Sequence, residues 1–131
     1  MREFWSVMPV DTPDSLLKLL RDTTVDLVRR DGPDLSARQL GVFLTCYTER
    51  EAQTVRALAS RLNVSKPAIT RALDRLAEFD LIRRKADPLD RRSVLVQRTE
   101  DGDLLLRAIR SILREANAAQ GRARPALRAA S

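Results

Sequence analysis

The sequence predicts a mainly helical fold with one small β-hairpin. Three observations support this prediction. Five segments carry apolar residues at helical spacing, residues that cap or stop helices separate them, and one pair of short alternating segments precedes the last of them. The expected order is four helices, two strands and a final helix. The chain has 131 residues, 44% of them hydrophobic, which is enough for one core, so we predict a single domain over residues 12–119.

The first two helices are expected between residues 12 and 50. The tripeptide Thr12 to Asp14 is a good helix start, because threonine caps, proline fits the first turn and aspartate suits the helix dipole. The run 29–33, which contains Gly32 and Pro33, ends this helix. Ser36 and Gln39 form a capping box for a second helix over about 37–50. Its apolar residues fall on most sides, so we expect it at the centre of the core.

Two short helices follow, joined by a tight connection. Thr54 caps a helix over about 55–62, and Ser65 caps another over about 66–79. Helices that cross at a steep angle need a small residue at the contact, which Ala59 provides, and Asn63 tolerates a left-handed turn. Apolar residues on both sides of the turn lock the pair together: Val55, Leu58, Leu62, Val64, Ile69, Leu73 and Leu76. This pattern is typical of a helix-turn-helix.

A basic hairpin is expected next. The strands are predicted at 81–85 and 93–97, with a polar turn over 86–92. Six basic residues are concentrated there: Arg83, Arg84, Lys85, Arg91, Arg92 and Arg98. Thr99 then caps a last helix over about 100–119.

The two ends of the chain are expected to lie outside the domain. Residues 1–11 are predicted to form an N-terminal arm, which is either disordered or packed on a partner subunit through Phe4 and Trp5. Residues 120–131 are rich in arginine and alanine and are expected to form a disordered tail.

The net charge of +6 is concentrated in one part of the chain. Residues 56–98 contain 11 basic and 5 acidic side chains, whereas residues 1–55 have a net charge of −2. Such a local excess favours a nucleic-acid partner. The single cysteine, Cys46, excludes an intrachain disulfide, and the lack of histidine excludes Cys/His zinc sites and histidine-dependent nucleophiles. We therefore expect no enzyme, no metal, no cofactor and no membrane span, and a cytoplasmic, nucleoid-associated protein.

The second helix of the pair is the candidate recognition helix. Its first turns are expected to enter the major groove of double-stranded DNA, with Ser65 and the adjacent amides at a phosphate and Lys66, Thr70 and Arg71 at base edges or phosphates. Asp74 limits the contact to these turns, because a carboxylate near phosphates is unfavourable. The lobe that binds DNA is expected to span residues 54–98.

The hairpin is expected to act as a wing that reaches the adjacent minor groove. Arg91 and Arg92 would enter the groove, and the carboxylate of Asp87 or Asp90 would hold the guanidinium of Arg92. The alternative is a surface cluster of ion pairs that contributes little. The full set of predicted DNA-contacting residues is Ser65, Lys66, Pro67, Thr70, Arg71, Arg75, Arg84, Arg91 and Arg92.

These features together resemble the MarR family of winged helix-turn-helix regulators. The resemblance covers about residues 12–119 and is carried by the segments Thr54–Ala59, Ser65–Arg71, Leu81–Arg84, Asp87–Ser93 and Thr99–Gly102. It implies a homodimer on a pseudo-palindromic operator, commonly a repressor released by a ligand or an oxidant. Dimers of the family join through the first and the C-terminal helices. This sequence differs from the family pattern in carrying Leu89 where arginine is common, and in ending where relatives have a further dimerising helix.

Some alternatives stay open at this stage. Cys46 is either a small buried hydrophobe or, less favoured, a redox sensor. A small-molecule effector is expected only by resemblance, with Arg29, Arg30, Tyr47 and Arg50 as candidate contacts. A protein-interaction module whose basic hairpin binds an acidic partner is the main alternative to DNA binding.

Overall fold

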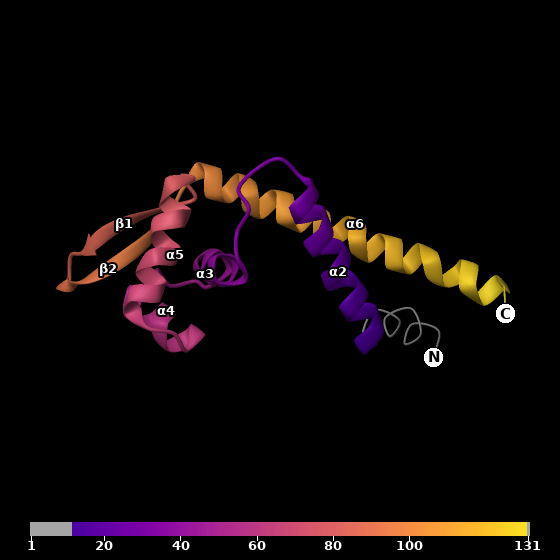
Figure 1. The fold of residues 1–131 in the computed structure, drawn as a ribbon, viewed down its shortest axis with the longest axis horizontal. Coiled ribbons are helices and arrows are strands. Elements are labelled where there is room, and N and C mark those ends of the chain that lie inside the picture. The colour runs from indigo at the N-terminus through magenta and orange to yellow at the C-terminus, as the bar shows by residue number, and fades with distance from the viewer. Residues whose placement is uncertain (1–11, 131) are drawn as a thin grey trace. The chain divides into compact units, whose positions relative to one another are not determined.

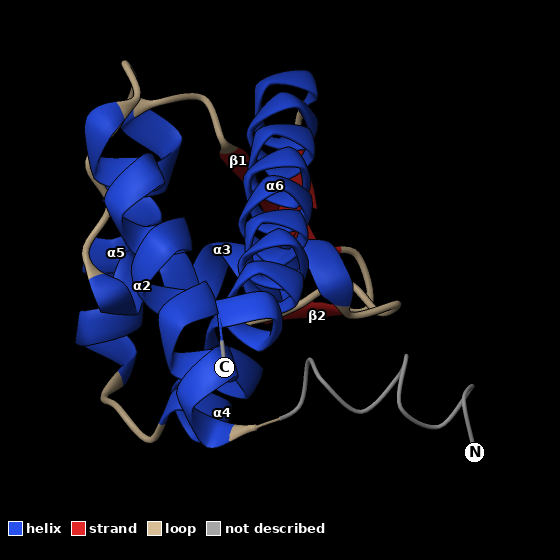
Figure 2. Cartoon of the chain, turned by 90° about the vertical axis from the view of Figure 1, so that its right-hand side faces the viewer, coloured by secondary structure: helices blue, strands red, loops and turns tan. Residues whose placement is uncertain are grey.

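The computed structural model describes residues 12–130, with side chains described as far as Gly121. The predicted N-terminal arm, with Phe4 and Trp5, lies outside the described residues. The elements are, in order, α2 (Pro13–Arg29), α3 (Ala37–Thr48), α4 (Val55–Leu62), α5 (Lys66–Glu78), β1 (Ile82–Asp87), β2 (Asp90–Arg98) and α6 (Glu100–Ala130) (Figure 1). The predicted fold class, mainly helical with one antiparallel hairpin, is confirmed (Figure 2).

The predicted helix caps are present. Thr12, Ser36, Thr54 and Ser65 each accept a hydrogen bond from the backbone N–H three residues further on. The capping box at Ser36 is complete, because its own N–H donates to the Gln39 side chain. These contacts satisfy backbone donors that a helix start would otherwise leave unpaired. The starts of these four helices therefore follow directly from the sequence.

The chain divides into two compact units. The central unit, residues 33–107, contains α3, α4, α5, the hairpin and the start of α6. The terminal unit contains α2 and the remainder of α6. The domain predicted over residues 12–119 therefore includes parts of both units. No described helix is both long and apolar enough to cross a membrane.

The core of the central unit is built around α3, as predicted. Val42 and Phe43 are fully buried, and α3 contacts α4, α5 and β2. Leu58 of α4 and Ile69 and Leu73 of α5 are also fully buried. Asn63 links α4 to α5 with a left-handed φ of 55°, the conformation expected of this turn. The helix-turn-helix is thus held by the residues that the sequence singled out.

A buried tyrosine joins three elements of the central unit. The Tyr47 hydroxyl donates to the Leu81 carbonyl, at 2.5 Å, and accepts from the Thr99 N–H, at 3.0 Å. Its ring stacks on Phe43 with centroids 4.4 Å apart. The Thr99 hydroxyl accepts from the Gly102 N–H, at 3.0 Å, and donates to the Asp80 carbonyl. As a result α3, the residue before β1 and the first turn of α6 are fixed to one another.

Gly102 is required by this packing. A Cβ built at this position would overlap the Tyr47 hydroxyl and the Leu81 carbonyl oxygen. The glycine in the Thr99–Gly102 motif therefore allows α6 to begin directly against Tyr47.

The hairpin is longer and its turn tighter than predicted. The strands pair from Ile82–Arg98 to Ala86–Val94, and Asp87 pairs with Asp90 after an irregularity, so only Pro88 and Leu89 lie in the turn. The edge of β2 also meets the residues before α4. The Val96 N–H donates to the Gln53 carbonyl at 2.9 Å, and Thr54 bridges to Leu95. This isolated bridge was not predicted, because Gln53 and Thr54 carry no strand pattern of their own.

Helix α6 continues to Ala130, whereas the sequence predicted an end near Ala119 and a disordered tail over 120–131. Alanine, arginine and glutamine all favour helix, Gly121 opposes helix by only about 1 kcal/mol, and Pro125, which costs about 3 kcal/mol in a helix interior, comes six residues after Ala119. The composition of this segment therefore does not force the helix to end at 119.

We predict that Gly102→Ala destabilises the protein by about 2 kcal/mol, because an overpacked side chain must displace the Tyr47 hydroxyl. Gly121→Ala is the matched control, since a Cβ there meets nothing within 4 Å. The control should leave stability unchanged or raise it by up to about 1 kcal/mol. Urea denaturation monitored by circular dichroism measures both. Equal stability of the two variants would contradict the proposed packing.

Candidate nucleic-acid interface

Helix α5 buries one face and exposes the other. The buried residues recur at helical spacing: Ala68, Ile69, Ala72, Leu73 and Leu76. Lys66, Pro67, Thr70 and Arg71 are all exposed. The predicted recognition face therefore points away from the core, as a groove contact requires. Ser65 is also exposed, and its hydroxyl oxygen accepts from the Ala68 N–H at 3.2 Å, so its cap role is established independently of any phosphate.

Arg75 differs from the other predicted contacts. Its guanidinium forms an ion pair with Glu78 at 3.0 Å and lies 4.5 Å from the centre of the Phe79 ring. Glu78 is the last residue of α5, and Phe79 is its C-cap. A contact between Arg75 and DNA would have to compete with these interactions, so the groove contact is expected to rest on the first turns.

Arg84 and Asp74 connect the hairpin to α5. The guanidinium of Arg84, on β1, forms an ion pair and hydrogen bond with the Asp74 carboxylate. The sequence predicts a DNA contact for Arg84 and indicates Asp74 only as a limit to the groove contact. The two residues are ten positions apart, and their pairing depends on how β1 packs on α5, which no local pattern reveals. Arg84 thus has a partner within the chain.

The contacts at the hairpin tip differ from the expectation that Asp87 or Asp90 holds the guanidinium of Arg92. The Asp87 carboxylate accepts from the Leu89 N–H at 2.9 Å, and the Asp90 carboxylate accepts from the Arg92 N–H at 3.0 Å. Within the described part of the chain, neither carboxylate pairs with a guanidinium. Short aspartate side chains readily accept a hydrogen bond from the backbone N–H two residues ahead. Here these hydrogen bonds form in place of an ion pair with the Arg92 guanidinium. Both residues orient the wing, but through its backbone.

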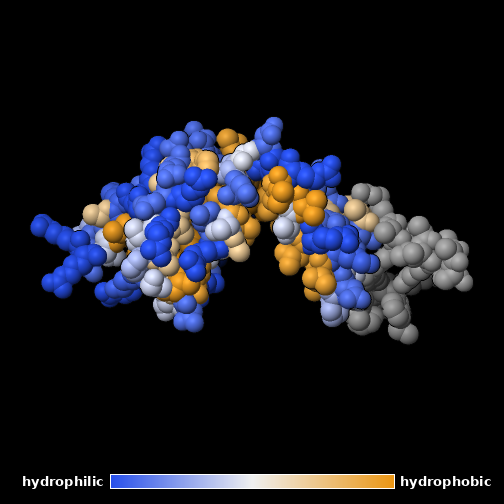
Figure 3. Space-filling model, in the orientation of Figure 1, coloured by the Kyte–Doolittle hydropathy of each residue, from blue (hydrophilic) through white to orange (hydrophobic). Residues whose placement is uncertain are grey.

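Arg91 and Arg92 lie at the start of β2 and are exposed. The extreme tip is formed by Pro88 and Leu89 instead. Figure 3 shows strongly hydrophilic side chains projecting from the hairpin end of the central unit. The hairpin therefore presents exposed cations beside an apolar tip.

Arg98, counted among the basic residues of the hairpin, has a structural role. Its guanidinium donates to the carbonyls of Cys46, at 3.0 Å, and Glu49, at 2.7 Å, and lies 5.6 Å from the centre of the Tyr47 ring. A cation at the C-terminal end of a helix satisfies carbonyls that lack intrahelical partners. Arg98 therefore caps α3 and anchors the base of β2.

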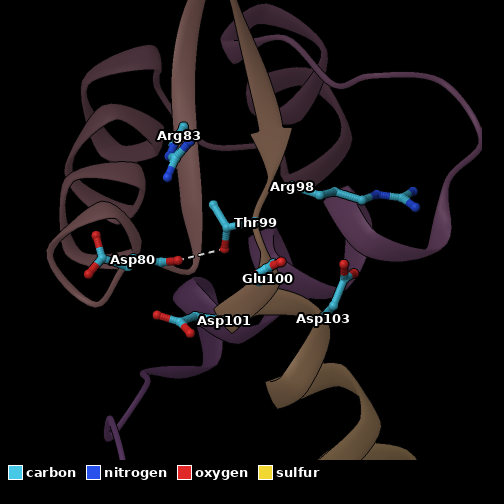
Figure 4. A pocket seen from close by; sticks show the side chains of 7 residues that line it. All are labelled: Asp80, Arg83, Arg98, Thr99, Glu100, Asp101 and Asp103. Atoms are coloured by element: carbon cyan, nitrogen blue, oxygen red, sulfur yellow. Dashed lines mark hydrogen bonds between the residues drawn. The ribbon is translucent and has the colours of Figure 1, made fainter.

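A polar pocket opens at the start of α6 (Figure 4). Its lining side chains are those of Asp80, Arg83, Arg98, Thr99, Glu100, Asp101 and Asp103. In Figure 4 Arg98 extends away from the others. The acidic residues of the first turn of α6 suit the positive end of the helix dipole. Among the described side chains, no group of three His, Cys, Asp or Glu is placed to hold a metal. This pocket is therefore explained by helix capping.

Cys46 is buried on α3. Burial raises the pKa of its thiol to about 11, and the nearby Arg98 guanidinium lowers the pKa only in part. The thiol therefore stays protonated throughout the physiological pH range, whereas oxidant sensing requires an exposed thiolate. This environment favours the interpretation of Cys46 as a small core hydrophobe.

We predict that native Cys46 resists thiol reagents. At pH 8 its reaction with a disulfide reagent should be on the order of 100-fold slower than in urea, because unfolding returns the pKa to its ordinary range and restores the thiolate. Absorbance at the released thiolate's maximum measures both rates. Comparable rates in the native and unfolded protein would show that the thiol is accessible and activated.

A helix-turn-helix followed directly by a basic hairpin defines the winged helix-turn-helix class. Comparison with known proteins shows a likeness to one family of this class. Residues 35–94 match the sequence profile of the MarR family. An HTH-type transcriptional regulator of Mycobacterium tuberculosis is 36% identical over 87 residues, which cover 66% of this chain and 60% of that protein. The chain thus spans about 60% of the length of the curated relatives it matches.

Solved structures of transcriptional regulators have a similar fold. The crystal structure of MarR has a TM-score of 0.62 and 27% identity, over 85% of this chain and 82% of that chain. A transcriptional regulator of Thermotoga maritima has a TM-score of 0.64 and 19% identity, over 90% and 75% of the two chains, and this likeness concerns the fold alone. The chain is thus similar to the MarR family of transcriptional regulators in the sequence of residues 35–94 and in its winged helix-turn-helix fold.

Proposed function

We propose that this protein is a transcriptional regulator that binds a specific sequence of duplex DNA, with α5 in a major groove and the hairpin in the adjacent minor groove. The observation that carries the proposal is the juxtaposition of the two elements. The exposed face of α5 and the cationic hairpin belong to one compact unit, β1 contacts α5, and the Asp74–Arg84 pair joins them.

The first turns of α5 have the chemistry that a major groove requires. A helix fits this groove, and the base edges there present a distinct pattern of donors and acceptors. Lys66 and Arg71 can donate to guanine O6 and N7, and Thr70 can contact a thymine methyl or a base edge. All three side chains are exposed. Pro67 lacks an N–H and the Ala68 N–H donates to Ser65, so the Lys66 N–H is the amide of the first turn that remains for a phosphate.

The hairpin supplies the electrostatic part of the contact. Arg91, Arg92 and Lys85 are exposed, and no ion pair engages them within the described residues. A narrow minor groove concentrates negative potential and attracts such cations. The Asp87 and Asp90 carboxylates lower the net charge of the tip, but they also fix the turn from which the arginines extend.

Replacing Arg71 with alanine should weaken operator binding by about ten- to a hundredfold and relax the base preference at one position, because a good base contact contributes about 1–3 kcal/mol. The operator would be selected from a randomised duplex pool by the wild-type protein, and affinity measured by mobility shift. Arg107→Ala, an exposed arginine of α6, is the control and should bind as the wild type does. If Arg71→Ala retains both affinity and base preference, α5 does not read the DNA.

We further propose a homodimer formed through the terminal unit. Helix α2 exposes a set of large apolar side chains, the most exposed of which are Leu17 at 64%, Leu20 at 62% and Val28 at 72%. Figure 3 shows apolar side chains gathered over α2 on the visible face. A patch of this kind on a helix is characteristic of an interface. Two subunits related by a twofold axis would address a pseudo-palindromic operator.

The double substitution Leu17→Glu and Leu20→Glu should convert the dimer to a monomer of 14.8 kDa with little effect on the fold, because both side chains are already exposed in the single chain. Sedimentation equilibrium measures the mass. Leu89→Glu, a matched change at the hairpin tip, should leave the dimer intact. A dimer that survives the double substitution would place the interface elsewhere.

As a regulator of this class the protein would act in the cytoplasm on nucleoid DNA, as a repressor whose operator affinity a small-molecule effector lowers. A reporter gene behind the selected operator tests the sign of regulation. Expression should fall when the protein is present and recover with the Arg71→Ala variant. Expression that rises with the protein would identify an activator.

A further inference from the structure

The tip of the hairpin carries an exposed leucine. Leu89 is 95% exposed, more than any other large hydrophobic side chain among the described residues. It lies with Pro88 in the two-residue turn between the paired Asp87 and Asp90. A single exposed leucine is ordinary on a protein surface, so its exposure alone indicates nothing. The position of Leu89 in the turn and the charges around it indicate the kind of surface that it would contact.

The turn holds Leu89 in a fixed place. The N–H of Leu89 donates to the Asp87 carboxylate at 2.9 Å, and the Asp90 carboxylate accepts from the Arg92 N–H at 3.0 Å. Pro88 has a fixed φ, which further limits the conformations of the turn. The leucine is thus presented outward on a stiff support, and little conformational entropy would be lost if it were bound.

The charges around the tip favour one kind of surface. Lys85, Arg91 and Arg92 are exposed on the two strands behind Leu89. An apolar point flanked by cations matches a minor groove, whose walls carry phosphates and whose interior presents sugars and base edges. The proposed function already brings the hairpin to this groove, and the present inference rests on that function.

We propose that Leu89 is a specificity-determining residue that enters the minor groove and favours A·T over G·C pairs beneath the hairpin. In the minor groove the two kinds of pair differ by the guanine N2 amino group. A leucine side chain offers no acceptor. A guanine beneath it would lose water from that amino group without gaining a hydrogen bond, and the amino group also occupies the space that the side chain needs. An arginine at this position would contribute mainly charge, whereas Leu89 contributes selection against guanine.

The test uses the operator selected by the wild-type protein, with the base pairs beneath the hairpin located by hydroxyl-radical footprinting. Three duplexes carry A·T, G·C or inosine·C at those positions. Inosine lacks the N2 amino group, so inosine·C presents the minor-groove face of A·T and the major-groove face of G·C. The wild type should bind the A·T and inosine·C duplexes alike and the G·C duplex about five- to tenfold more weakly, as expected for one unsatisfied polar group.

Leu89→Ala should reduce this discrimination to less than about twofold and leave the salt dependence of binding unchanged, because leucine contacts no phosphate. Arg92→Ala is the contrasting variant. It should weaken binding to all three duplexes, lower the slope of log affinity against log salt by about 1, and keep the preference against G·C. Both side chains are exposed, so neither variant should affect folding.

Two results would overturn the inference while leaving the proposed function intact: unchanged discrimination in Leu89→Ala, or equal weakening by inosine·C and G·C. A selected operator with no protection beneath the hairpin would overturn both the inference and the minor-groove contact of the proposed function. If the wild-type protein selects no duplex at all, the proposed function fails, and the inference fails with it. Retention of an acidic protein on the immobilised chain, lost in Arg92→Ala, would then identify the interaction module considered as the alternative.

Discussion

The structure of the central unit depends on the buried hydroxyl of Tyr47. Tyr47 is 3% exposed, and its hydroxyl both donates to Leu81 and accepts from Thr99. A buried polar group left without a partner costs about 1–3 kcal/mol, so both contacts are strongly preferred. Together they fix where the hairpin leaves the core and where α6 begins. The Asp74–Arg84 pair lies at the surface, and pairs of that kind contribute at most about 1 kcal/mol, so it adjusts the direction of the hairpin without determining it.

The hairpin is consequently anchored at its base and exposed at its tip. Arg98 binds the last carbonyls of α3, and the edge of β2 pairs with Gln53, so the base is held on two sides. Among the described residues, the far end makes only its own turn contacts at Asp87 and Asp90. A stiff element with a free end beside an exposed helix face can follow two neighbouring grooves of a duplex. This arrangement relates the buried hydrogen bonds to the proposed function.

Features that depend on local sequence could be predicted, and features that depend on long-range packing could not. The caps at Ser36 and Ser65, the buried and exposed faces of α5 and the order of elements follow from residues within one or two turns of each other. The roles of Arg84 and Arg98 were missed, because their partners lie 10 to 52 residues away. In a sequence each of them is one more cation on a basic hairpin. The hairpin turn was predicted too long, because aspartates and proline indicate a turn without showing that side chains will tighten it.

The central claim is that α5 and the hairpin occupy different grooves of one duplex. Its most direct test attaches an iron chelate that cleaves DNA to a single cysteine, introduced at Thr70 or at Leu89 in a Cys46→Ser background. On the selected operator, cleavage from position 70 should show the strand offset of a major-groove source. Cleavage from position 89 should show the opposite offset, of a minor-groove source, about half a helical turn away. The same offset from both positions, or cleavage from neither, would contradict the account.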